Sequence, residues 1–190
     1  KKFSTDIKIG DESIETVSET KLLGTIITDD LKWNKNTNYI VKETNKRMQL
    51  LHKASKFTNN LKDLKQIYML QIRSKLDQSA VVWHSSLSQK NRNDLERVQK
   101  SAMRCILGDS YRGYKDALEK LGLMTLEERR NQMCFKYAKQ SLKLDKMKKF
   151  FTRNKNGHAM DIRSSEFYKV EKYQTERFGK SAIPFMVKLL

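Results

Sequence analysis

The stretch "LLGTIITDDLKWNKNTNYIVKETNKRMQLLHK", residues 22–53, contains a change in the spacing of its apolar residues. Residues 21–27, "KLLGTII", form a short apolar run that predicts a strand. From residue 34 onward the apolar residues recur with the spacing of a helix. The predicted buried face carries Ile40, Val41, Thr44, Met48 and Leu51, and the opposite side carries Lys35, Lys42, Lys46 and Lys53. The stretch therefore predicts a strand that leads directly into an amphipathic helix.

The pair Asp29-Asp30 at this junction fits two interpretations. Phosphoryl transfer by two metal ions needs two or three converging carboxylates, and this is the only adjacent pair of aspartates in the sequence. Aspartate is also a usual turn and cap residue, so the pair fits the end of a strand, with Asp30 or Asn34 capping the helix. We favour the turn, because none of the acids upstream ends a long buried strand.

Composition predicts a mainly α-helical fold and a polyanionic partner. One proline and seven glycines are few for an all-β protein. Lys and Arg number 39 against 22 acids, for a net charge of +17. A domain this basic is typical of nucleic-acid binding, although a solubilising surface is the alternative. The sequence lacks a run of 18 apolar residues, so we expect no membrane span.

Local patterns divide the chain into a small antiparallel β element, a helical bundle and a basic helical extension. Residues 5–27 predict a hairpin that turns at residues 10–12, followed by one more strand. Gly108 is a natural helix stop, and Thr125 with Glu128 forms a capping box. The predicted helices are 35–53, 61–76, 89–107, 114–121 and 125 to about 144, with loops at 79–88 and 152–158. Residues 160–190 either dock on the bundle as irregular structure or lead into a further part.

Further predictions concern which side chains are buried. The core residues expected from the second and fifth helices are Leu61, Leu64, Ile67, Tyr68, Leu76, Leu126, Met133, Tyr137 and Ala138. Trp33 and Trp83 could stack on bases, but packing in a core or hinge is favoured for large aromatic residues.

Catalytic and metal chemistry finds little support in the residue types. Cys105 and Cys134 lie in apolar helical patterns, which predicts buried, reduced thiols. Three scattered histidines give no zinc spacing. The sequence contains no G-x-S-x-G motif and no glycine-rich phosphate loop. We therefore expect no catalytic residue and no metal ligand in this chain.

Binding chemistry is better supported. The lysine row, defined as Lys35, Lys42, Lys46 and Lys53, can follow a phosphate backbone from one side of a helix. Arg97, Lys100 and Arg104 can do the same from the helix 89–107. Each phosphate contact would release counterions and make binding sensitive to salt. The alternative is that both rows are ordinary solvated helix faces.

Several segments together resemble a known family. "KLLGTIITDDLKWN" is similar to the palm–thumb junction in reverse transcriptases of non-LTR, LINE-like retrotransposons. Lys21, Leu23, Gly24, Leu31 and Trp33 match, with Asp29 or Asp30. Asn36 and Thr37 stand near the place of the usual histidine, and Gln78 where an aromatic residue is common. Downstream, the resemblance continues in the same order with "SKLDQSAVVWHSS" (74–86), "LERVQKSAMRCILG" (95–108), "LGLMTLEERRNQM" (121–133) and "KSAIPFMVKLL" (180–190).

The resemblance implies an RNA-directed DNA polymerase that uses Mg²⁺, with its catalytic aspartates upstream of Lys1. Leu22, Leu23 and Gly24 would form the primer grip, where Gly24 lets the backbone approach the primer. Residues 1–33 would end the palm, 34–108 would form the thumb and 109–190 a C-terminal extension. The expected partners are an RNA/DNA template–primer duplex and the rest of the polymerase chain. The location would be intracellular, and nuclear when the enzyme acts on DNA.

Taken alone, this part would grip the duplex through its backbone, without catalysis and without a cofactor of its own. A second class is a non-catalytic helical module derived from a retroelement, which binds proteins or nucleic acid. The dependence of affinity on salt distinguishes a nucleic-acid partner from a protein partner.

Overall fold

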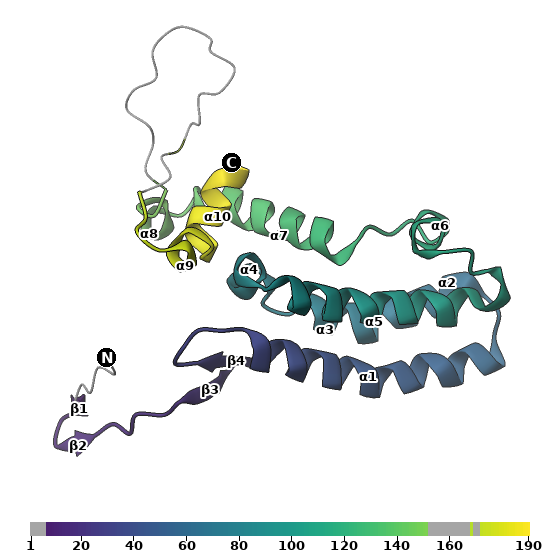
Figure 1. Cartoon of the computed structure of the whole chain (residues 1–190), viewed down its shortest axis with the longest axis horizontal. Coiled ribbons are helices and arrows are strands. Elements are labelled where there is room, and N and C mark those ends of the chain that lie inside the picture. Colours follow the sequence, from purple (N-terminus) through teal and green to yellow (C-terminus); the bar gives the residue numbers. More distant parts are fainter. Residues whose placement is uncertain (1–6, 152–167, 169–171) are drawn as a thin grey trace, which may run out of the picture.

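The computed structural model describes residues 7–151, 168 and 172–190, and within them the fold is mainly helical with two small hairpins near the N-terminus (Figure 1). This confirms the predicted fold class. The α-helices are α1 (Asn34–Phe57), α2 (Leu61–Ile67), α3 (Ser74–Asp77), α4 (Ala80–Trp83), α5 (Gln89–Leu107), α6 (Tyr114–Lys120), α7 (Leu126–Ser141), α8 (Asp145–Lys148), α9 (Glu176–Gly179) and α10 (Ala182–Leu189). Three further helical turns are η1 (Tyr68–Arg73, a π-helix) and the 3₁₀-helices η2 (His84–Ser86) and η3 (Gly108–Ser110).

The β element consists of two antiparallel hairpins, not the expected hairpin and single strand. β1 (Lys8–Ile9) pairs with β2 (Glu12–Ser13), and β3 (Glu19–Leu22) pairs with β4 (Thr25–Thr28). Leu23 and Gly24 join β3 to β4, and both have positive φ, 47° and 79°, as a type I′ turn requires. The apolar run 21–27 is therefore split between two facing strands, so its prediction as one strand was wrong.

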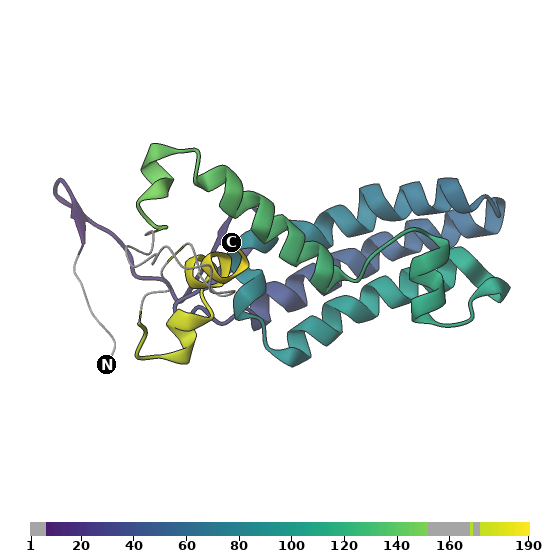
Figure 2. The same cartoon turned by 90° about the horizontal axis from the view of Figure 1, so that it is seen from above.

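The helices form three tiers in Figure 1, and in the view from above in Figure 2 α7 lies in front, with α1 between α5 and the α2–η1–α3 run. α1 forms one outer tier, α5 with the α2–η1–α3 run forms the middle tier, and α7 forms the other outer tier. α1 packs closely against α5. The predicted face of α1 is buried at Ile40, Thr44, Met48 and Leu51, whereas Val41 is half-buried. α1 extends one residue before and four beyond the predicted 35–53.

The predicted helix 61–76 is one helical run, but its centre is not α-helical. Six residues, Tyr68–Arg73, adopt the wider π-helix, in which hydrogen bonds join residues five apart. The Arg47 Nη1 donates to the Gln71 carbonyl oxygen at 2.9 Å, which pins this segment to α1. Leu64, Tyr68 and Leu76 are buried as predicted, Ile67 is half-buried, and Leu61 is 43% exposed, so its assignment to the core was wrong.

Residues 79–88, expected to be a helix end and a loop, contain the short helices α4 and η2. Trp83 and His84 are both fully buried here. The Trp83 Nε1 donates to the Gln78 carbonyl at 3.1 Å. Trp33 is buried as well, at 8% exposed. Both tryptophans therefore belong to the core, as the favoured interpretation predicted.

The helices α5, α6 and α7 agree closely with the sequence patterns. α5 has the predicted bounds and ends at Gly108, whose φ is 49°. The capping box is present: the Thr125 Oγ1 accepts from the Glu128 N–H, and the Glu128 carboxylate accepts from the Thr125 N–H. α7 stops at Ser141, three residues before the expected end.

The buried face of α7 differs from the predicted one. Leu126 and Ala138 are buried as expected and Met133 is half-buried, but Tyr137 is 43% exposed. Arg130 and Cys134 take the remaining inward positions at the four-residue spacing of a helix face. Cys134 is a buried free thiol as expected, whereas the free Cys105 is half-buried.

The last segment docks on the bundle as a regular helix. α10 packs against α7 and α4, where Met186 and Val187 join Cys134, Ala138 and Phe151 in a second apolar cluster. The larger cluster runs from Trp33 to Leu126, so its side chains lie on both sides of the predicted boundary at residue 108. The loop predicted at 152–158 lies outside the described residues.

Candidate nucleic-acid interface

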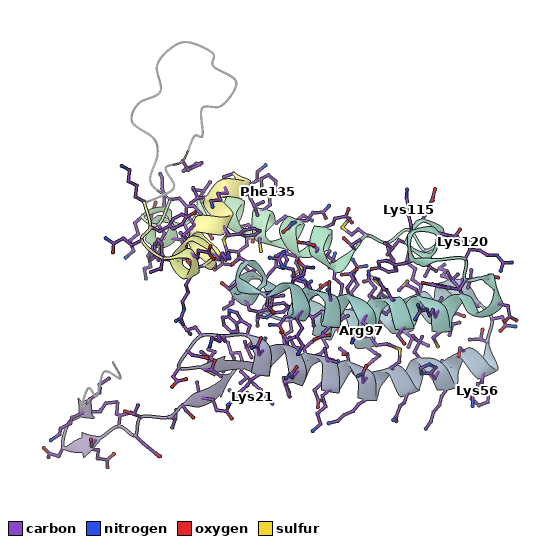
Figure 3. The ribbon with its side chains drawn as sticks, in the orientation of Figure 1. Lys21, Lys56, Arg97, Lys115, Lys120 and Phe135 are labelled. Atoms are coloured by element: carbon purple, nitrogen blue, oxygen red, sulfur yellow. The ribbon has the colours of Figure 1, made fainter. Side chains whose placement is uncertain are left out.

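The lysine row lies on the outer side of α1. Lys35, Lys42, Lys46 and Lys53 are all exposed, and the helix face opposite them is packed in the core. At about 100° per residue the four side chains leave the helix within roughly 40° of one another, and they span about 27 Å along its axis. Sticks with nitrogen tips project from this side of α1 in Figure 3. Lys56 extends the row by one turn and was missed by the sequence analysis.

The lysines of the row differ in their local pairing. The Lys35 Nζ is 2.6 Å from Glu19 Oε2, and the Lys46 Nζ is 2.7 Å from Glu43 Oε1. The hydrogen bond and the charge of Glu19 raise the pKa of Lys35 above its ordinary value. Within the described part of the chain, Lys42 and Lys53 have no ion-pair partner. These two are therefore the most available for an external anion.

A groove between α1 and α5 contains Arg97, and it shares Asn38, Val41 and Asn45 with a hollow lined by Lys42 and Lys46. The groove has a volume of about 270 Å³. It is lined by Asn38, Val41, Asn45, Asp94, Arg97, Val98 and Ser101. Arg97 pairs with Asp94 at 3.3 Å, and its side chain stays 77% exposed. An anion that follows α1 would meet polar amides and this guanidinium at the edge of the row (Figure 3).

The other two cations predicted on α5 are directed toward the residues around α6. The Lys100 Nζ lies 5.1 Å from the ring centre of Tyr114, and the Arg104 guanidinium lies 5.4 Å from that of Tyr111. The structure therefore places Arg97 in the groove that adjoins Lys42 and Lys46, whereas Lys100 and Arg104 contact Tyr114 and Tyr111.

The predicted primer-grip residues form the exposed tip of the second hairpin. Leu22 and Leu23 are 59% and 85% exposed. Leu23 has a left-handed backbone, which is costly for a residue with a branched side chain. At Gly24 the positive φ of 79° disfavours other residues, and an added Cβ would lie 2.5 Å from Gln78 Nε2, so that amide would have to move. That same nitrogen donates to the Leu23 carbonyl oxygen at 2.9 Å and anchors the tip to the end of α3.

A cationic cluster beside this tip was missed by the sequence analysis. The ammonium groups of Lys21 and Lys75 lie 4.5 and 4.7 Å from the ring centre of Tyr39. The pKa of Tyr39 is lowered, first by its hydrogen bond with Lys21 and then by the charges of both lysines. Nothing in the sequence spacing brings residues 21, 39 and 75 together, because three separate elements must first pack against one another.

Asp29 and Asp30 form the turn between β4 and α1. Asp30 Oδ1 accepts from the Thr28 hydroxyl at 2.7 Å and from the Lys32 N–H at 3.0 Å, and these bonds lower the pKa of Asp30. Asp29 Oδ1 accepts from the Asp30 N–H at 2.8 Å. Neither Asp30 nor Asn34 caps α1, which corrects that part of the prediction: the N-cap position is Trp33, without a side-chain cap.

Across 7–151, 168 and 172–190 no three Asp, Glu, His or Cys side chains are grouped so that they could hold a metal ion. No helix in that part of the chain has both the length and the apolar character needed to span a bilayer.

The geometry defines a helical chain with a basic face on α1 and a hairpin tip beside it. In comparisons with known proteins, no protein-family model, no curated protein and no solved structure matches the chain.

Proposed function

We propose that the chain is the C-terminal part of a LINE-like reverse transcriptase and holds the RNA/DNA template–primer duplex through its phosphate backbone. The observation that carries this proposal is the exposed lysine row on α1, with Arg97 beside it and the β3–β4 tip at one end. An A-form hybrid is recognised mostly by shape and by its backbone, which suits a straight row of flexible cations.

Catalysis would take place in a part of the polymerase upstream of Lys1, where Mg²⁺ would be bound. Asp29 and Asp30 are less suited to that ion, because they shape the turn before α1 and, among the described residues, no third acid is grouped with them. Leu22, Leu23 and Gly24 would approach the primer strand. The exposed tip and the left-handed Leu23 support this role, since backbone strain of this kind gathers at functional sites.

The exposed apolar surface of residues 7–17 supports a protein partner as well. Ile7, Ile9, Ile14 and Val17 are 45–72% exposed on hairpins too small to be stable alone. In the proposed polymerase these side chains pack against the palm. A helical protein-interaction module derived from a retroelement is the second candidate, and the same apolar surface favours it.

Charge reversal on α1 tests the proposal. We expect Lys42→Glu, Lys46→Glu and Lys53→Glu together to abolish salt-sensitive binding of an RNA/DNA hybrid by the 190-residue chain. Each lost phosphate contact lowers the log–log salt slope by about 0.7–0.9, so three contacts account for roughly 2–3. Fluorescence anisotropy with a labelled hybrid, repeated over a series of salt concentrations, gives the affinity of each variant and its log–log salt slope.

A matched control carries the same change in net charge elsewhere. Lys115, Lys136 and Lys143 are exposed on α6, on α7 and just after α7. The triple Lys→Glu variant at these positions should keep most of the slope. Equal losses in both triple variants would mean that only net charge matters, and unchanged affinity after reversal on α1 would rule out the proposed interface.

A further inference from the structure

The cluster of Lys21, Tyr39 and Lys75 is a meeting point of three elements. Lys21 comes from β3, Tyr39 from α1 and Lys75 from α3. Both ammonium groups lie within 5 Å of the Tyr39 ring centre, at 4.5 and 4.7 Å. Lys75 as a whole residue is only 8% exposed, whereas Lys21 is exposed. A buried lysine is usually paired with an acid, whereas Lys75 contacts the neutral Gln78 and the Tyr39 ring.

The positive charge of the cluster is not balanced by a carboxylate in contact. Among the described residues, neither Lys21 nor Lys75 has an acid within ion-pair distance. The Lys75 Nζ donates to the neutral Gln78 Oε1 at 2.5 Å. The acid whose charge reaches Tyr39 and Lys75 is Glu43, and it is paired with Lys46 at 2.7 Å. Two ammonium groups around one ring repel each other, so an anion placed between them would be stabilised by both.

We propose that the Lys21–Tyr39–Lys75 cluster is a discrete binding site for one phosphate group. Two ammonium groups and a phenol hydroxyl can all donate hydrogen bonds to phosphate oxygens, which are strong acceptors of charge-assisted bonds. Gln78 holds the site in place, because its amide bonds Lys75 on one side and the Leu23 carbonyl on the other. A bound phosphate would thus connect the hairpin to α1 and α3.

The phosphate has two possible sources, a nucleic-acid backbone or a free phosphate compound. The first source rests on the proposed function, and the second does not. The site also differs from the lysine row, since its cations are held by an aromatic ring and by Gln78, whereas Lys42 and Lys53 of the row are solvated. Substitutions in the two places can therefore be tested separately.

Calorimetric titration of the 190-residue chain with inorganic pyrophosphate, and separately with an RNA/DNA hybrid, tests the site. We expect Lys21→Gln and Lys75→Met each to weaken pyrophosphate binding roughly tenfold or more, the loss expected for one charged hydrogen bond. Lys115→Gln, an exposed lysine on α6, should leave it unchanged. Lys21 is exposed, so its substitution keeps the test valid if Lys75→Met fails to fold.

The pKa of Tyr39 shows whether pyrophosphate binds at this cluster or elsewhere on the chain. Pyrophosphate should raise the pKa of Tyr39, because its negative charge opposes the field of the two lysines that lowers this pKa. The phenolate absorbance of the chain, minus that of Tyr39→Phe, isolates this one tyrosine.

Each outcome has a distinct meaning. A Tyr39 pKa that does not respond to saturating pyrophosphate, or equal weakening in Lys115→Gln, overturns the site and leaves the proposed function standing. A response to pyrophosphate without any hybrid binding supports the site, assigns it to free phosphate compounds and contradicts the proposed function. A response to both probes supports a backbone phosphate.

Discussion

Replacing Arg130 by methionine should stabilise the fold, although the substitution removes a charge. Arg130 is fully buried on α7, and its Nε, Nη1 and Nη2 have no hydrogen-bond partner among the described residues. Its guanidinium lies 5.6 Å from the Trp83 ring centre. Burial lowers the pKa of Arg130, although the charges of Glu96, Asp77 and Glu127 oppose that shift. The side chain therefore bears a large desolvation cost with partial compensation.

The expected gain in stability is the desolvation cost that the substitution removes, minus the contact with Trp83 that it loses. An unsatisfied buried donor costs about 1–3 kcal/mol, and more when it is charged. The loss of the contact with Trp83 costs up to about 2 kcal/mol. Methionine is long and flexible enough to fill the same space. We expect a net stabilisation of about 1–3 kcal/mol, similar to other replacements of buried ions by apolar residues. In a chain of this size each kcal/mol raises Tm by roughly 2–4 °C.

Arg129→Met, at the neighbouring position, is a control that should lower the stability of the fold. Its Nε lies 2.5 Å from Asp77 Oδ2, and the Asp77 side chain is only 11% exposed. Arg129→Met leaves that buried carboxylate with Arg73 at 4.0 Å as its remaining partner, so we expect a loss of about 1–3 kcal/mol. Urea denaturation followed by far-ultraviolet circular dichroism measures both variants. Destabilisation of Arg130→Met by as much as Arg129→Met would refute the argument, because it would show that the Arg130 guanidinium is well compensated.

Three further predictions concern pH, capping and thiol chemistry. Burial lowers the pKa of His84 to about 4 from 6.5, so the folded state binds its proton less readily than the unfolded state does. Stability should fall between those two values by up to about 3 kcal/mol as the pH decreases, and this slope should be shallower in His84→Gln, as urea titrations at several pH values would reveal. Thr125→Ala should cost about 1 kcal/mol, whereas Thr125→Ser keeps the cap; equal unfolding midpoints for the two would contradict this. Burial raises the pKa of the Cys134 thiol to about 11, so native-state alkylation followed by mass spectrometry should modify the half-buried Cys105 first, and the reverse order would count against the packing of α7.

Local signals in the sequence were sufficient for the helices that carry them. α5 begins after Ser88, whose hydroxyl accepts from the Asn91 N–H, and it ends at Gly108, so both ends are encoded within a few residues. The capping box of α7 was found for the same reason. The lysine row was predictable because helical spacing alone places its members on one side.

Other features depend on packing between distant segments. The inward face of α7 was predicted with Tyr137, but the structure buries Arg130, and charge patterns alone do not anticipate a buried arginine. The Lys21–Tyr39–Lys75 cluster requires the hairpin, α1 and α3 to be assembled first. The β3–β4 turn was hidden because leucine is unusual at a positive φ, so "LLG" did not indicate a turn.

The π-helical segment Tyr68–Arg73 has a consequence for how this chain can be compared with relatives. A π-turn accommodates one residue more than an α-turn of the same span, so loss of one residue here would restore a regular α-helix. Leu64 before the segment and Leu76 after it would keep their places in the core. A one-residue deletion elsewhere in the run would instead rotate one side by about 100° and expose it. Any homologue that is one residue shorter in this run should therefore have its gap between Ile67 and Ser74.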